Sequence, residues 1–163
     1  MTSLDELIQP VRRGVRQLVD RARGEPTRPL VEEIMLAFGR LGVAIAHQPA
    51  LREAPEVRAL IDELQPVLHD QSIVFDAYPG DVLLHFTGTW DGGELAQLGW
   101  LRSCMQFFAD LIGGTPGAGE LTSWQESIDD LDDHLRQWAE REGGFAAAEL
   151  GVPRSHWWWR FAA

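Results

Sequence analysis

The sequence predicts a mainly α protein, a compact bundle of about five helices with one inserted β-hairpin at residues 73–87. Two observations support this fold class. Apolar residues recur every three or four positions through most of the chain, which is the period of an amphipathic helix. Between residues 72 and 87 the period shortens to two, which is the period of a strand. The length of 163 residues favours one domain, with a core large enough to fold without a metal or a disulfide.

Three helices are expected in the first part of the chain. The first begins at residues 3–6, whose sequence has the form of a capping box. The second follows Thr27, a residue type that often caps helices, and the third begins at Pro55. Each of the three shows one apolar face. Gly39 and Gly42 lie three positions apart in the second helix, a spacing that permits close approach of a neighbouring helix.

The hairpin prediction depends on two short runs of β-branched and aromatic residues. These runs are residues 72–77 and 82–87, and the segment 78–81 between them has the composition of a turn. Within it, Pro79 presets φ and Gly80 permits a positive φ. Because a lone hairpin is marginally stable in water, we expect it to pack on the helices.

Two further helices and a distinct tail complete the prediction. The helix at about residues 94–112 is apolar on most sides, which is typical of a buried central helix. The helix ending near residue 142 carries a seam of large apolar residues spaced 4, 3, 4 and 3, which are Trp124, Ile128, Leu131, Leu135 and Trp138. We expect residues 1–150 to form a single helical domain and residues 151–163 to form an Arg- and Trp-rich C-terminal tail packed on it.

The charge of the chain narrows the classes of partner. The net charge is -11, and residues 41–163 hold only 7 Arg against 19 Asp and Glu. Such a chain repels phosphate, so we expect no binding to nucleic acid or to an anionic membrane. A basic protein would be attracted, although the same charge also serves solubility.

Composition also indicates a compartment. Cys104 is the only cysteine, which excludes an intrachain disulfide. Residues 1–6 carry acids where a signal peptide needs basic residues, and no apolar run reaches the ~18 residues of a membrane span. We therefore expect a reducing cytoplasm. The 14 basic residues are all Arg, and together with the abundance of Ala and Gly this suggests a bacterial source.

No motif for catalysis, a metal or a cofactor stands out, and we predict none of these. The best single catalytic candidate is His85, which would act as an acid or base if its strand face lines a pocket. An enzyme or small-ligand hypothesis would place that pocket between the hairpin and the central helix, with Trp90, Trp100 and His69 nearby. Cys104 lies in an apolar helix and is expected to be an inert, buried thiol.

Two elements are candidates for binding a protein partner. The first is an acidic helix face that includes Asp129, Asp130, Asp132 and Asp133. The second is the tail, whose candidate residues are Arg154, His156, Trp157, Trp158, Trp159 and Arg160. Three adjacent Trp side chains cannot share one face, so the tail closes a groove on the bundle, forms a recognition hot spot, or is a substrate for another enzyme.

These observations favour a small cytoplasmic protein-binding module of the toxin-neutralising or adaptor type, which acts by occupying a surface of its partner. One alternative is an enzyme or small-ligand-binding protein with a pocket near His85. Another is a modified-peptide precursor in which a folded leader carries the Trp-rich tail. A homodimer formed through the apolar seam of residues 124–138 also remains open.

Overall fold

The structure is a computed structural model, and it describes residues 2–86, 92–142 and 152–159. Its α-helices are α1 (Leu4–Val19), α2 (Arg28–His47), α3 (Pro55–Asp70), α4 (Ser72–His85), α5 (Gly92–Ile112), α6 (Pro116–Gly119) and α7 (Trp124–Glu142). Two short 3-10 helices, η1 (Pro49–Glu53) and η2 (Trp157–Trp159), accompany them. The described residues contain no strand. The predictions of a mainly α fold and of a helical bundle are confirmed.

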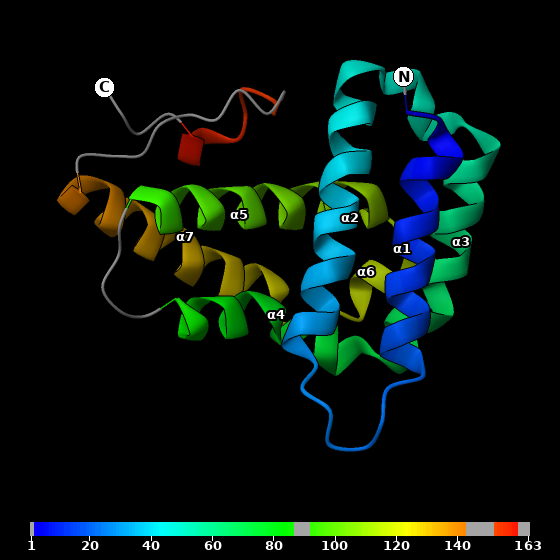
Figure 1. Ribbon diagram of the computed structural model, residues 1–163, viewed down its shortest axis with the longest axis horizontal. Coiled ribbons are helices and arrows are strands. Elements are labelled where there is room, and N and C mark those ends of the chain that lie inside the picture. Colours follow the sequence, from blue (N-terminus) through cyan, green and yellow to red (C-terminus); the bar gives the residue numbers. More distant parts are fainter. Residues whose placement is uncertain (1, 87–91, 143–151, 160–163) are drawn as a thin grey trace.

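The helices form two groups that cross each other. Helices α1, α2 and α3 run alongside one another, whereas α4, α5 and α7 run across them (Figure 1). Helix α2 joins the groups, because it packs against α1 on one side and against α5 on the other. The seam of α7 is buried, from Trp124 to Trp138, and α7 packs against both α4 and α5.

Close contact between α2 and α5 depends on two glycines. A Cβ atom added at Gly39 would lie 2.5 Å from the sulfur of Cys104 and 2.7 Å from Cζ2 of Trp100. A Cβ atom added at Gly42 would overlap the ring of Phe107. The spacing of these glycines thus lets α5 approach α2 more closely than any residue with a side chain would allow.

The N-terminal capping box forms as predicted, but the second helix lacks the predicted cap. The backbone N–H of Glu6 donates to the hydroxyl of Ser3 at 3.2 Å, and the backbone N–H of Ser3 donates to the carboxylate of Glu6 at 2.7 Å. Thr27 precedes α2 without a capping hydrogen bond from its side chain. Instead, the first turn of α2 contains Pro29, and the fixed φ of proline suits that position.

The hairpin prediction is wrong, because residues 72–85 form helix α4. Its buried side chains are Phe75, Tyr78, Pro79 and Val82, which follow the helical spacing i, i+3, i+4 and i+7. Pro79 inside a helix costs about 3 kcal/mol, whereas each large apolar side chain that is fully buried contributes about 1.5–3 kcal/mol. Gly80 does not adopt the positive φ that a turn would use. Burial of this face therefore outweighs the local turn signal.

Candidate interaction surface

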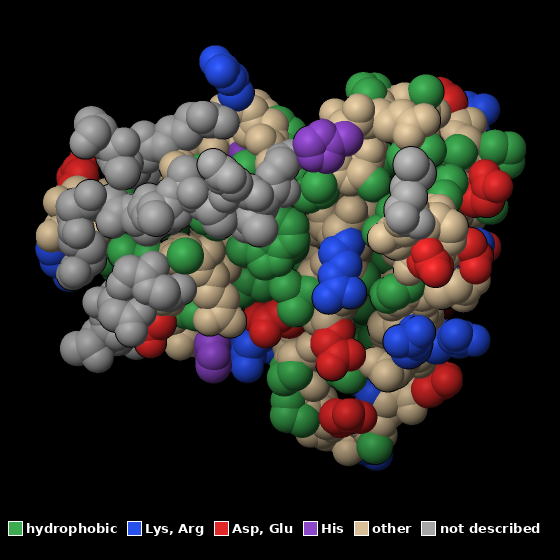
Figure 2. All heavy atoms as spheres, turned by 45° about the horizontal axis from the view of Figure 1, so that its top comes forward, with side chains coloured by type: hydrophobic (Ala, Val, Ile, Leu, Met, Phe, Trp, Pro, Cys, Tyr) green, Lys and Arg blue, Asp and Glu red, His purple; other side chains and the backbone are tan. Residues whose placement is uncertain are grey.

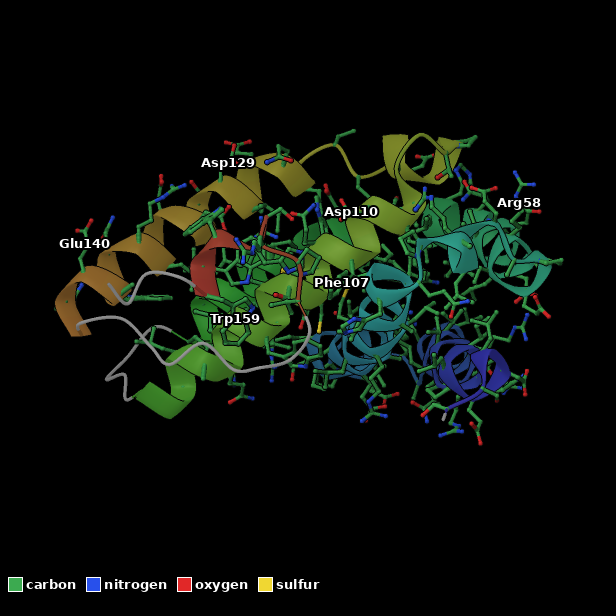
Figure 3. The ribbon with its side chains drawn as sticks, turned by 90° about the horizontal axis from the view of Figure 1, so that it is seen from above. Arg58, Phe107, Asp110, Asp129, Glu140 and Trp159 are labelled. Atoms are coloured by element: carbon green, nitrogen blue, oxygen red, sulfur yellow. The ribbon has the colours of Figure 1, made fainter. Side chains whose placement is uncertain are left out.

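The tail residues are packed against the central helix. His156 is 1% exposed, and Trp158 and Trp159 are each 2% exposed. Figure 3 shows Trp159 beside α5. Trp157 is half-buried and Arg154 is exposed, whereas Arg160 lies outside the described residues. Three of the five described candidate residues of the tail are therefore inaccessible to a partner in this conformation.

Ser103 on α5 is the hydrogen-bonding centre of the tail contact. Its hydroxyl oxygen accepts the indole N–H of Trp158 at 3.0 Å and the indole N–H of Trp159 at 2.8 Å. The same oxygen lies 2.9 Å from Nδ1 of His156. A hydroxyl oxygen has two lone pairs and one proton, so the proton of Ser103 is donated to Nδ1 of His156. His156 is then the neutral tautomer that carries its own proton on Nε2.

This Ser–His pair is structural rather than catalytic. Ser103 is fully buried, and both of its lone pairs already accept hydrogen bonds, so it cannot act as a nucleophile. Burial, with a smaller contribution from the nearby guanidinium of Arg102, lowers the pKa of His156 to about 4. The neutral state that the geometry requires is therefore also the state favoured at neutral pH.

A buried ion pair lies beside the tail and involves one of the candidate aspartates. Nε of Arg102 donates to Asp132 at 2.7 Å, and Nη2 donates to its second carboxylate oxygen at 3.2 Å. The guanidinium carbon of Arg102 also lies 4.2 Å from the ring centroid of Trp158, a cation–π contact. Asp132 thus points inward, between α7 and α5.

The other three candidate aspartates face outward. Asp129, Asp130 and Asp133 are exposed on α7, and Figure 3 shows Asp129 on the outer side of that helix. Glu126, one turn earlier, is also exposed. The four predicted aspartates therefore divide into three on a surface and one that holds the helices together.

Helix α4 carries an exposed apolar face that the sequence reasoning missed. Its exposed side is a row of apolar or small residues spaced 4, 3 and 4, hereafter the α4 stripe: Ile73, Ala77, Gly80 and Leu84. The side chain of Ile73 is 84% exposed and that of Leu84 is 73% exposed. The hairpin prediction divided these residues between two strands and a turn, and so hid this row. The helical spacing of Phe75, Tyr78 and Val82 is the signal that would have revealed it.

The residues of the predicted pocket lie apart. His85 is exposed at the C-terminal end of α4, and His69 is exposed near the end of α3, where it pairs with Glu120 at 2.8 Å. Helix α4 separates the two histidines, and its 14 residues span roughly 20 Å. Trp100 lies against Gly39 of α2, and Trp90 lies outside the described residues. The structure therefore does not assemble the described members of this set, His69, His85 and Trp100, around one cavity.

The reactivity predicted for Cys104 agrees with its surroundings. The thiol is fully buried between α5 and α2, beside Gly39. Burial raises the pKa of the Cys104 thiol well above its ordinary value, so the thiolate needed for nucleophilic attack is disfavoured.

Comparison with known proteins adds no information on function. No family model matches this chain, and no curated protein or solved structure matches it either. In the part of the chain that the structure describes, none of the helices is both long and apolar enough to cross a membrane. The functional argument therefore depends on the surfaces described above.

Proposed function

We propose that this chain is a protein-binding module that acts by occupying a surface of its partner, and that the α4 stripe is its contact surface. The observation that carries the proposal is the exposure of two large aliphatic side chains, Ile73 and Leu84, on one helix face. Single exposed aliphatic residues are common, but an apolar row on one face is typical of an interaction site.

The neighbouring charge supports the same proposal. Helix α4 packs against α7, whose exposed residues include Glu126, Asp129, Asp130 and Asp133. Arg136 pairs with Asp133 at 3.2 Å, so the other three acids provide the net negative charge of this cluster. A cluster of one sign raises the rate at which an oppositely charged partner arrives and selects against partners of the same sign. We infer that a partner is steered by α7 and held by α4. Toxin-neutralising and adaptor proteins of the cytoplasm are the classes that act in this manner.

A comparison of captured proteins tests this proposal. The full chain carries an affinity tag and is incubated with an extract of its source cells, as wild type and as the double variant Ile73→Ser and Leu84→Ser. The matched control is Val19→Ser, because Val19 is another large aliphatic residue, 51% exposed, on α1. Quantitative mass spectrometry should find a partner that wild type and the Val19 variant retain and the double variant loses. Identical sets of captured proteins for all three chains would contradict the proposal.

A further inference from the structure

We propose that the occupant of the α4 stripe is a basic amphipathic helix of a protein partner. This inference depends on the proposed function, since it names the kind of partner that the same surface accepts. It is carried by the shape of the stripe and by the sign of the charges along its edges.

The shape of the stripe suits a helix. Spacings of 4, 3 and 4 place its four residues along one side of α4, as in the seam of a two-helix contact. From Ile73 to Leu84 the row is about 16 Å long, which is three helical turns. Large residues stand at its ends and the small residues Ala77 and Gly80 at its centre. A Cβ atom added at Gly80 would meet nothing within 4 Å, so an approaching side chain has room to insert there.

The edges of the stripe are acidic. Asp76 precedes Ala77 and Asp81 follows Gly80, so one carboxylate borders each side of the row. Asp76 also accepts the backbone N–H of Ser123 at 3.0 Å, which fixes its carboxylate at the junction between α4 and the start of α7. Basic side chains on both flanks of an apolar helix face would meet these two carboxylates.

Little positive charge reaches these two acids. Burial raises the pKa of Asp81, and the guanidinium of Arg28 on α2 lowers it, but that guanidinium is itself paired with Glu32 at 3.2 Å. No Arg or Lys occurs from residue 71, just before α4, to residue 101, whereas four acids do: Asp76, Asp81, Asp91 and Glu94. Helices α1 to α3 differ, because Figure 2 shows side chains of both signs intermingled over that half of the molecule. A basic helix is therefore attracted to α4 more than to α1–α3.

The same charges disfavour a second copy of this chain as the occupant. Each copy has a net charge of -11, and pairing two α4 stripes would bring two sets of acidic edges together. Like charges that face each other across an interface destabilise it. The same acidic charge that repels a second copy of this chain attracts a basic partner.

Two synthetic helical peptides of identical length test the inference. Both carry leucine at the seam positions, and the flanking positions are lysine in one peptide and glutamate in the other. Binding of each labelled peptide to the full-length chain is measured by fluorescence anisotropy at low and high salt. We expect the lysine peptide to bind at least about tenfold more tightly than the glutamate peptide, and this preference to shrink at high salt.

Matched variants locate the binding. The double variant Ile73→Ser and Leu84→Ser should no longer bind the lysine peptide, whereas Val19→Ser should bind it as wild type does. Asp81→Asn should weaken binding of the lysine peptide. It should leave the affinity for the glutamate peptide unchanged or raise it slightly. Circular dichroism confirms that each variant is folded.

Three results would overturn the inference. They are equal affinity for the two peptides, lysine-peptide binding that survives the double α4 substitution, and a dimer in sedimentation equilibrium that the same substitution dissociates. The capture experiment is independent of all three. A partner that requires α4 while the peptides bind equally would leave the proposed function standing and reject only the basic helix.

Discussion

The hydroxyl of Ser103 and the indole nitrogen of Trp159 lie 2.8 Å apart, which links the central helix to the tail across 56 positions of sequence. Through the same oxygen, Ser103 also holds Trp158 and His156. The tail is thereby part of the core of the protein, although its composition alone is equally typical of an exposed recognition segment. This relationship gives the first two predictions.

Replacing Ser103 by Ala should destabilise the protein. The change removes the acceptor for two buried indole N–H groups and the donor to Nδ1 of His156. Because a buried polar group without a partner costs about 1–3 kcal/mol, we expect the free energy of unfolding to fall by about 2–4 kcal/mol. Urea denaturation measures the change. The control is Ser155→Ala at an exposed tail position, which should stay within about 0.5 kcal/mol of wild type. Equal stability of the two variants would show that the tail is not held by Ser103.

Acid should destabilise the protein through His156. Its pKa is lowered to about 4 in the folded state, while the ordinary value is 6.5. As pH falls from 6.5 to 4, the unfolded chain takes up a proton that the folded chain refuses, so stability decreases over this interval. The loss over this interval should be about 2–3 kcal/mol, and it should level off below pH 4.

Two measurements check this pH dependence. NMR should show the His156 ring titrating near pH 4, and urea denaturation should show a shallower loss of stability between pH 6.5 and 4 for His156→Asn than for wild type. The comparison removes the contribution of carboxylates, which both chains share. A His156 ring that titrates near 6.5 would refute the buried, neutral tautomer.

Removing one partner of the ion pair between Arg102 and Asp132 should destabilise the protein. Asp132→Asn leaves the buried guanidinium of Arg102 without its counter-charge, and the expected cost is about 3–5 kcal/mol. Asp129→Asn, at an exposed position of the same helix, should change stability by less than about 0.5 kcal/mol. Thermal unfolding of the two variants compares them directly. If Asp132→Asn lowers stability as little as Asp129→Asn does, the carboxylate of Asp132 lies in solvent and the buried ion pair is refuted.

Two glycine substitutions should have opposite effects. Gly42→Ala places a Cβ atom against the ring of Phe107 and should destabilise the protein by about 1–3 kcal/mol. Gly80→Ala adds a Cβ atom in open space within a helix and should be neutral or stabilising by up to about 1 kcal/mol. If residues 78–81 formed a turn with Gly80 at positive φ, the second substitution would instead destabilise. Chemical denaturation therefore tests both the α2–α5 contact and the helical state of α4.

The error at α4 shows how far periodicity alone can be used. Residues 72–85 contain β-branched residues and a Pro–Gly pair, which predict a hairpin, but the same segment also contains apolar residues at helical spacing. The choice is made by what surrounds the segment. Phe75 stacks on Phe108 of α5 with ring centroids 5.7 Å apart, and Tyr78 donates its hydroxyl hydrogen to Glu32 of α2 at 3.2 Å. A helix presents both side chains to the same core, whereas a strand would point them to opposite faces.

The sequence by itself determined the strongly amphipathic helices, the capping box at Ser3 and Glu6, and the close approach permitted by Gly39 and Gly42. These features depend on residues a few positions apart, so their signals are local. Only the tertiary structure decided that α4 is a helix, that its stripe is exposed, that Asp132 turns inward, and that Ser103 holds the tail. Each of these depends on contacts between residues 30 to 56 positions apart, which no short window of sequence contains.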